Sequence, residues 1–188
     1  MTLPDNRNLT DEQLVASFLR GEKKMLDVLF DRYIERLLRY ITMFLKSSEE
    51  ARDLAQDIFI KIFQSLENYK FMGKFDRWFF VIARRAMIDL HRKKKLKTFS
   101  FNSLGIDESS IPDRGNSTDK AQELLQVLPA KDREILQLRF IENLSYEEIS
   151  EITGMAEGTL RNIVCRSVRR LQENNSDELS ENQGMARE

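Results

Sequence analysis

The chain has 188 residues, of which 41% are hydrophobic and 32% are charged, with 30 Lys and Arg against 31 Asp and Glu. The charged fraction exceeds the roughly 25% of typical soluble domains and the apolar fraction suffices for a core, which excludes a membrane protein and a fully disordered chain. Only 7 Gly and 3 Pro are present, which favours a nearly all-helical protein of one long or two short domains. The net charge of −1, taken as a total, argues against a nucleic-acid partner.

The single cysteine, Cys165, and the N-terminal sequence bear on the compartment. One cysteine cannot form an internal disulfide, and the N-terminus has neither the basic start nor the apolar run of a secretory signal. No apolar stretch approaches the roughly 20 residues of a membrane span. We therefore expect a cytoplasmic protein without membrane insertion. One His and one Cys, without HExxH or CxxC spacing, also predict no metal site, and we expect no cofactor.

Helical signals fill the first half of the chain. Thr10, with Gln13 three residues later, forms a capping box that opens two helices joined near Gly21. Ser47 and Glu50 form a second capping box, and the helix that follows has an apolar stripe at four-residue spacing. The stripe consists of Leu54, Ile58, Ile62 and Leu66. After a loop over 67–74, apolar periodicity resumes at Phe75 and ends in the basic run 92–95, so residues 10–95 predict one helical domain.

The second half begins with a segment in which apolar residues show no helical periodicity. Residues 96–118 are rich in Ser, Asn, Asp, Gly and Pro, which indicates a flexible linker. Helical signals return at Asp119, so 119–172 predicts a second, smaller helical domain, followed by a frayed polar tail over 173–188. The predicted fold class is therefore all-α, with two small helical domains joined by a linker and a helix-turn-helix in the C-terminal one.

The helix-turn-helix is predicted from SYEEISEITGMAEGTLRNIVCRSVRRL. Ser145 and Glu148 form a third capping box before a short helix that ends at Gly154, and a longer helix follows from Glu157. Residues 143–157 hold four acids and no base, whereas 158–171 hold four arginines and no acid. A recognition helix that approaches phosphates must lack carboxylates, and the second helix meets this condition.

The arginines of this second helix suggest two kinds of DNA contact. Arg161 and Arg166 flank Asn162 on one face and could donate to base edges, while Arg169 and Arg170 are better placed for phosphates. The alternative is that these arginines only complement the helix macrodipole and stay solvated. Cys165 is interpreted as a packing or groove-facing small residue rather than a redox switch.

Aromatic and basic residues alternate between Tyr69 and Lys97. Six aromatics occur within twelve residues, and the segment 84–97 then holds seven Lys and Arg against one Asp. Phe75 and Phe79 fit a core face, which leaves Trp78 and the loop aromatics for another role. Aromatics beside a basic groove are what single-stranded DNA binding uses. The alternative is that the aromatics are core and the basic run is a solvated helix end. His91 is expected at the surface without a role.

These features together resemble the extracytoplasmic-function (ECF) group of bacterial RNA polymerase sigma factors. The resemblance is carried by DLAQDIFIKIFQSL, by FDRWFFVIARRAMIDLHRKKK and by LPAKDREILQLRFIENLSYEEISEITGMAEGTLRNIVCRSVRRL, in the family's order and spacing. It implies that 10–95 is sigma region 2, which binds the polymerase clamp helices and opens the −10 element. It also implies that 119–172 is sigma region 4, which reads the −35 element. The implied partners are core RNA polymerase, promoter DNA as duplex and as melted non-template strand, and an anti-sigma factor.

The resemblance also implies roles for individual residues. The residues implied to bind core polymerase are Asp53, Gln56, Asp57 and Lys61. Those implied for the −10 element are Asn68, Tyr69, Lys70, Phe71, Lys74, Phe75, Arg77, Trp78, Arg84, Arg85 and Arg92. Those implied for the −35 element are Ser145, Tyr146, Thr159, Arg161, Asn162, Arg166, Arg169 and Arg170.

Two positions depart from the family's usual residues. Ile163 stands where an arginine is usual, and Phe71 with Met72 stands where a small residue is common. The resemblance therefore implies neither the −35 nor the −10 sequence that this chain prefers.

Two other classes of function are alternatives to a sigma factor. A conventional repressor or activator would use only the C-terminal helix-turn-helix, with 10–95 as a sensor or dimerisation module. An enzyme acting on nucleic acid would need an acid/base pair, a nucleophile or a phosphate loop, and none is evident in the sequence. We therefore expect no enzymatic activity.

Overall fold

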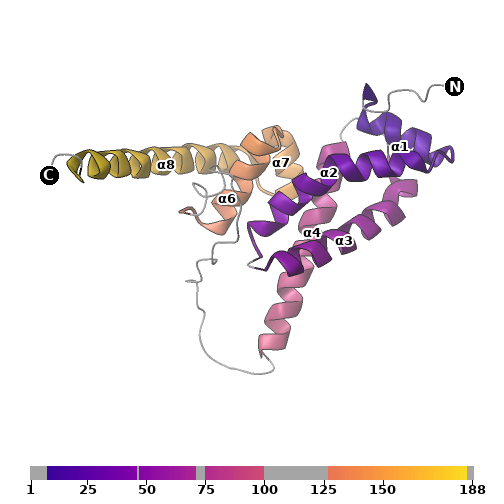
Figure 1. The fold of residues 1–188 in the computed structure, drawn as a ribbon, viewed down its shortest axis with the longest axis horizontal. Coiled ribbons are helices and arrows are strands. Elements are labelled where there is room, and N and C mark those ends of the chain that lie inside the picture. Colours follow the sequence, from indigo (N-terminus) through magenta and orange to yellow (C-terminus); the bar gives the residue numbers. More distant parts are fainter. Residues whose placement is uncertain (1–7, 46, 71–74, 100–126, 186–188) are drawn as a thin grey trace. The chain divides into compact units, whose positions relative to one another are not determined.

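The structure is a computed structural model that describes residues 8–45, 47–70, 75–99 and 127–185. The chain divides into two compact units, residues 1–115 and 116–188, and each is described by itself. Within the described ranges the regular elements are helices, with no strand (Figure 1). The all-α fold class is thereby confirmed. The part of the predicted linker from 100 to 118, and the segment 119–126, lie outside the described residues.

The described residues of the first unit form four α-helices and one short 3₁₀ helix. They are α1 (Asp11–Leu19), α2 (Lys24–Thr42), α3 (Ser48–Ser65), η2 (Leu66–Asn68) and α4 (Phe75–Phe99). The capping box of Thr10 and Gln13 forms as predicted at the start of α1. Gly21 has a φ of 102° in the turn before α2, a backbone conformation that glycine adopts readily. At α3 the Ser47 side chain accepts the backbone N–H of Glu50.

The core of the first unit lies between α1, α2, α3 and α4. The apolar stripe of α3 is buried as predicted and faces α2 and α4. Aromatic rings from different helices meet there, such as Tyr33 with Phe79, whose centroids are 4.5 Å apart, and Tyr40 with Phe80, at 5.4 Å. Helix α4 continues to Phe99, four residues beyond the predicted domain end at residue 95.

Over its described residues, the second unit contains α6 (Ala130–Leu136), η3 (Gln137–Ile141), α7 (Tyr146–Thr153) and α8 (Glu157–Met185). The capping box of Ser145 and Glu148 forms at α7, and Gly154 ends that helix with a φ of 74°, both as predicted. The helices α7 and α8 therefore form the predicted helix-turn-helix.

The C-terminal segment differs from the prediction. A frayed tail was expected after residue 172, but α8 continues to Met185. Arg169 and Glu173, one turn apart, form an ion pair of 2.9 Å across the predicted boundary. The polar composition of this segment suggested a frayed end, but Glu, Gln and Ser interrupt a helix far less than Gly or Pro does. No glycine occurs between Gly158 and Gly184.

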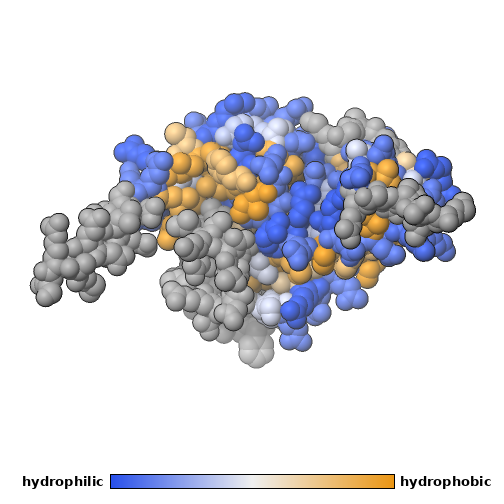
Figure 2. Space-filling model, turned by 45° about the horizontal axis from the view of Figure 1, so that its top comes forward, coloured by the Kyte–Doolittle hydropathy of each residue, from blue (hydrophilic) through white to orange (hydrophobic). Residues whose placement is uncertain are grey.

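Hydrophilic side chains cover much of the face drawn in Figure 2, with apolar side chains in patches between them. The large apolar side chains that are exposed among the described residues include Leu19, Phe30, Ile60, Ile88, Val127 and Phe140. One of them, Ile60, lies on the helix that carries the predicted polymerase-binding residues.

Candidate functional site

The exposed face of α3 carries all four residues predicted to bind polymerase. Asp53, Gln56, Asp57 and Lys61 are each exposed, on the side of the helix opposite the buried stripe. Ile60 lies among them and is 46% exposed, and sequence reasoning missed it. The sequence could have predicted this exposure, because Ile60 does not belong to the apolar stripe of the helix. The face therefore combines charged groups with an apolar centre, as protein interfaces commonly do.

The aromatic residues around the start of α4 are buried to different degrees. Tyr69 is 6% exposed and Phe75 is 2% exposed, so neither ring face is available to stack on a DNA base. Both pack against Trp78, with ring centroids 5.0 Å and 5.4 Å from the Trp78 ring. Phe75 thus lies in the core face predicted for it, since burial of a large ring is strongly favourable, and the role of Tyr69 at the −10 element stays a prediction. Trp78 stays partly exposed.

The polar and basic residues predicted for the −10 element occupy two places. Asn68 and Lys70 are exposed at the end of η2. The remaining arginines lie along α4 in two rows, each with a seven-residue spacing, so the members of a row are about 10 Å apart on one side of the helix. One row is Arg77 and Arg84, which are half-buried, and the other is Arg85 and Arg92, which are exposed. Phe71 and Lys74 lie outside the described residues.

The second unit exposes six of the eight residues predicted for the −35 element. Ser145 and Tyr146 are half-buried at the start of α7. Those exposed on α8 are Thr159, Arg161, Asn162, Arg166, Arg169 and Arg170. Ile163 is 6% exposed and belongs to the core, so an apolar residue fits this position. Cys165 is exposed beside Arg166, which agrees with a groove-facing residue and not with a packing one.

A stack of side chains joins α7 to α8. The guanidinium carbon of Arg161 lies 4.7 Å from the centre of the Tyr146 ring, and that of Arg139 lies 5.0 Å from it. Arg139 also donates to the carbonyl of Leu144 at 2.9 Å. Arg139 was missed by sequence reasoning because it lies in η3, outside the helix-turn-helix segment. The stack concentrates two cations where α7 meets the recognition helix.

Three of the four α8 arginines pair with carboxylates of the same unit. Arg161 contacts Glu157 at 2.8 Å, Arg169 contacts Glu173 at 2.9 Å, and Arg166 contacts Asp132 at 3.0 Å. The Asp132 side chain is buried and also accepts from the Ser167 hydroxyl at 3.2 Å. The positive charge of α8 is thus partly compensated in the free protein, although Arg161, Arg166 and Arg169 each keep more than half of their side-chain surface exposed.

Among the described residues, no group of three or more His, Cys, Asp or Glu side chains is arranged to hold a metal ion. In the same ranges, no helix has both the length and the apolar character that a bilayer span requires.

Comparison with known proteins agrees with this geometry. Residues 29–97 match the family described as Sigma-70 region 2, and residues 118–171 match Sigma-70, region 4. The ECF RNA polymerase sigma factor SigM of Bacillus subtilis is 27% identical over 152 residues, which cover 78% of this chain and 93% of that protein. The RNA polymerase sigma factor SigV of the same organism is 31% identical over 127 residues, which cover 67% of this chain and 76% of that protein.

A solved structure shares the fold. The sigma factor RpoE of Bartonella quintana, in complex with the anti-sigma factor NepR, superposes with a TM-score of 0.64 at 23% identity. The likeness covers 78% of this chain and 94% of that one. Both sigma regions occur in this chain, with region 2 before region 4 as expected. The chain therefore belongs to the sigma-70 family as an ECF sigma factor, the subunit with which RNA polymerase recognises promoters.

Proposed function

We propose that this sigma factor divides promoter recognition between its two units, with the first opening the −10 element and the second reading the −35 element. The observation that carries the proposal is the sorting of residues along α8. Six of the eight residues predicted for the −35 element are exposed there, while Ile163, where the family usually has arginine, is buried. A recognition helix needs this separation between a core face and a basic face.

The exposed face of α3 is the proposed docking surface for the polymerase clamp helices. Asp53 and Asp57 supply negative charge, and Ile60 supplies apolar surface that a partner can bury. Charged groups at an interface mainly set orientation and association rate, while buried apolar side chains supply affinity. We therefore assign Ile60 to the same surface as Asp53, Gln56, Asp57 and Lys61.

The start of α4 is the proposed site for the melted non-template strand. Trp78 is partly exposed, and its ring packs against the buried rings of Tyr69 and Phe75. The two arginine rows of α4 extend from this point and can follow a phosphate backbone. Tyr69 and Phe75 thus support Trp78 from the core, while Trp78 and the arginines contact the DNA strand.

The partners of the free subunit complete the proposal. Since RpoE of Bartonella quintana was solved with an anti-sigma factor, we assign a protein of that class to this chain as a regulator. The family consists of initiation factors, which supports the absence of an enzymatic activity of its own. The proposed location is the cytoplasm, at the nucleoid when the subunit is bound to polymerase.

Transcription with purified components tests the proposal. Core polymerase with this protein should initiate, on some genomic fragments, transcripts that core alone does not make. Failure on every fragment would refute it. A conventional regulator should instead bind duplex DNA tightly without core. The paired arginines of α8 favour weak binding by the free subunit, because three of its four cations already contact carboxylates.

A further inference from the structure

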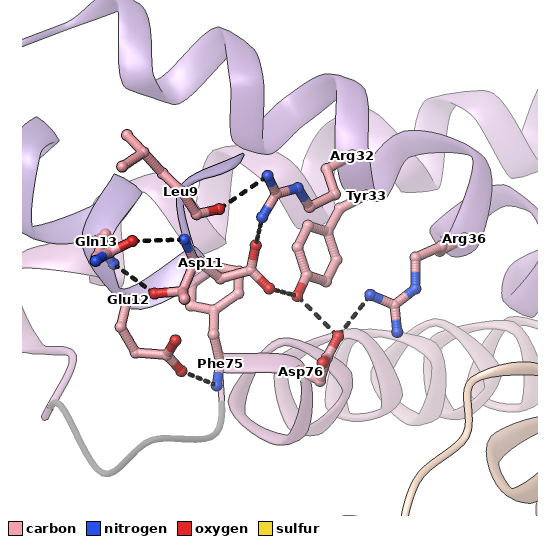
Figure 3. A network of polar contacts seen from close by, with 10 residues as sticks. Leu9, Asp11, Glu12, Gln13, Arg32, Tyr33, Arg36, Phe75 and Asp76 are labelled. Carbon is pink, nitrogen blue, oxygen red and sulfur yellow. Dashed lines mark hydrogen bonds and ion pairs between the residues drawn. The ribbon is translucent and has the colours of Figure 1, made fainter. Parts of the chain in front are cut away.

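Five side chains connect three helices at the start of α4 (Figure 3). Asp11 of α1 accepts hydrogen bonds from the Arg32 guanidinium and from the Tyr33 hydroxyl, the latter at 2.6 Å. Asp76, in the first turn of α4, lies 2.7 Å from the same hydroxyl and accepts from Arg36 at 2.5 Å. The two carboxylates are each paired with an arginine, and one tyrosine hydroxyl lies between them.

Tyr33 holds this arrangement from within the core. Burial, together with the charges of Asp76 and Asp11, raises the pKa of Tyr33 well above its ordinary value, so the hydroxyl keeps its proton. Its ring packs against Phe75 with centroids 5.2 Å apart and against Phe79 at 4.5 Å. Tyr33 therefore holds the first turn of α4 through a polar contact with Asp76 and an apolar contact with Phe75.

A second carboxylate of α1 contacts the backbone of α4. The side chain of Glu12 accepts the N–H of Phe75, the first residue of α4, at 3.2 Å (Figure 3). The first N–H groups of a helix have no partner within the helix, and a negative charge at that end is favourable. Glu12 therefore acts as a cap supplied by a helix 63 residues away in sequence.

We infer that Asp11 and Glu12 are positioning residues for −10 recognition, which they support by fixing the first turn of α4 and so the orientation of Trp78. The inference rests on the proposed role of Trp78 and the α4 arginines. Helix α1 lies before residue 29, where the match to Sigma-70 region 2 begins, so that match assigns it no part in the site. The link is direct, since Phe75 contacts both the Glu12 carboxylate and the Trp78 ring.

The test compares reconstituted holoenzymes on a promoter fragment that the wild-type holoenzyme opens. The variants are Glu12→Ala, Glu12→Gln and Asp11→Asn, and Glu22→Ala is the control, an exposed acid in the turn after α1. Open complexes are measured by permanganate footprinting, on the native fragment and on fragments with single −10 substitutions. Affinity for core polymerase and closed-complex formation are measured on the same samples.

Loss of the cap should reduce the equilibrium constant for promoter opening about fivefold in Glu12→Ala, the factor that corresponds to a typical cap. Discrimination among −10 bases should fall as well, with core affinity and closed complexes unchanged. Glu12→Gln should restore most of the activity, because the amide oxygen still accepts the Phe75 N–H. Asp11→Asn, which preserves the side-chain shape, should also reduce opening and carries the test if Glu12→Ala does not fold.

Three results would overturn the inference. They are unchanged opening and base preference in folded Glu12→Ala and Asp11→Asn, an equal loss in Glu22→Ala, and a loss of core affinity parallel to the loss of opening. A wild-type holoenzyme that opened no promoter would instead contradict the proposed function itself, so the two failures are distinguishable.

Discussion

Arg161 offers the most direct test of how α8 reads DNA. In the free protein its guanidinium contacts Glu157 at 2.8 Å and lies over the Tyr146 ring. Breaking an exposed pair between residues one turn apart costs about 0.3–0.5 kcal/mol. A bidentate contact from arginine to a base discriminates by about 1–3 kcal/mol. The base contact therefore exceeds the cost of releasing Glu157, and Arg161 can leave it to bind DNA.

We expect Arg161→Ala to remove the preference of the holoenzyme for one base of the −35 element. Its preferences at the other −35 positions should not change. Subtracting the cost of releasing Glu157 from the value of the base contact gives a net loss of about 0.5–2.7 kcal/mol, or roughly 2- to 100-fold in affinity. The assay is competition between duplexes that differ by single −35 substitutions. Arg170→Ala is the matched control, because Arg170 is exposed on the same helix and predicted to contact phosphate.

A uniform result would refute base reading by Arg161. If Arg161→Ala weakened binding equally on every duplex and lowered the salt slope by about 0.9, the residue would be a phosphate contact. Glu157→Gln provides a check on the pairing, since removal of a weak competing carboxylate should improve binding by no more than about twofold.

Three more predictions concern other parts of the molecule. Trp78→Ala should impair promoter opening more than closed-complex formation, which permanganate footprinting of the melted bases can contradict. Ile60→Ala should weaken core binding by about 1 kcal/mol if its exposed half becomes buried, whereas Ile88→Ala, with similar exposure on α4, should leave core affinity unchanged. Asp132→Ala removes the acceptor of Arg166 and Ser167 and should destabilise the second unit by about 1.5–3 kcal/mol. Faster hydrogen exchange in α6 and α8 would measure that loss, and unchanged exchange would contradict it.

Local signals predicted the helices well because they act over a few residues. The capping boxes at Thr10 and Ser145 and the turn at Gly154 all formed as expected, since a side chain three residues away or one backbone conformation decides each of them. Periodicity also identified the buried stripe of α3 and, by exclusion, its exposed face.

Contacts between distant residues could not be predicted in the same way. Asp76 lies 43 residues from Tyr33, and Asp132 lies 34 residues from Arg166. Nothing in the local sequence selects these partners, because tertiary packing brings them together. The burial of Tyr69 could not be predicted for a related reason, since an aromatic ring beside basic residues is compatible with stacking on DNA and with burial in a core.

The ion pairs of α8 bear on how a chain with a net charge of −1 binds DNA. A net charge of −1 argued against a nucleic-acid partner, yet α8 carries four arginines on its exposed side. Glu157, Glu173 and Asp132 each hold one of them in the free protein. A DNA phosphate must compete with these carboxylates, so the pairs lower the affinity of the free subunit for any DNA sequence. Polymerase, bound through the proposed surface on α3, then supplies the additional contacts that make promoter binding favourable.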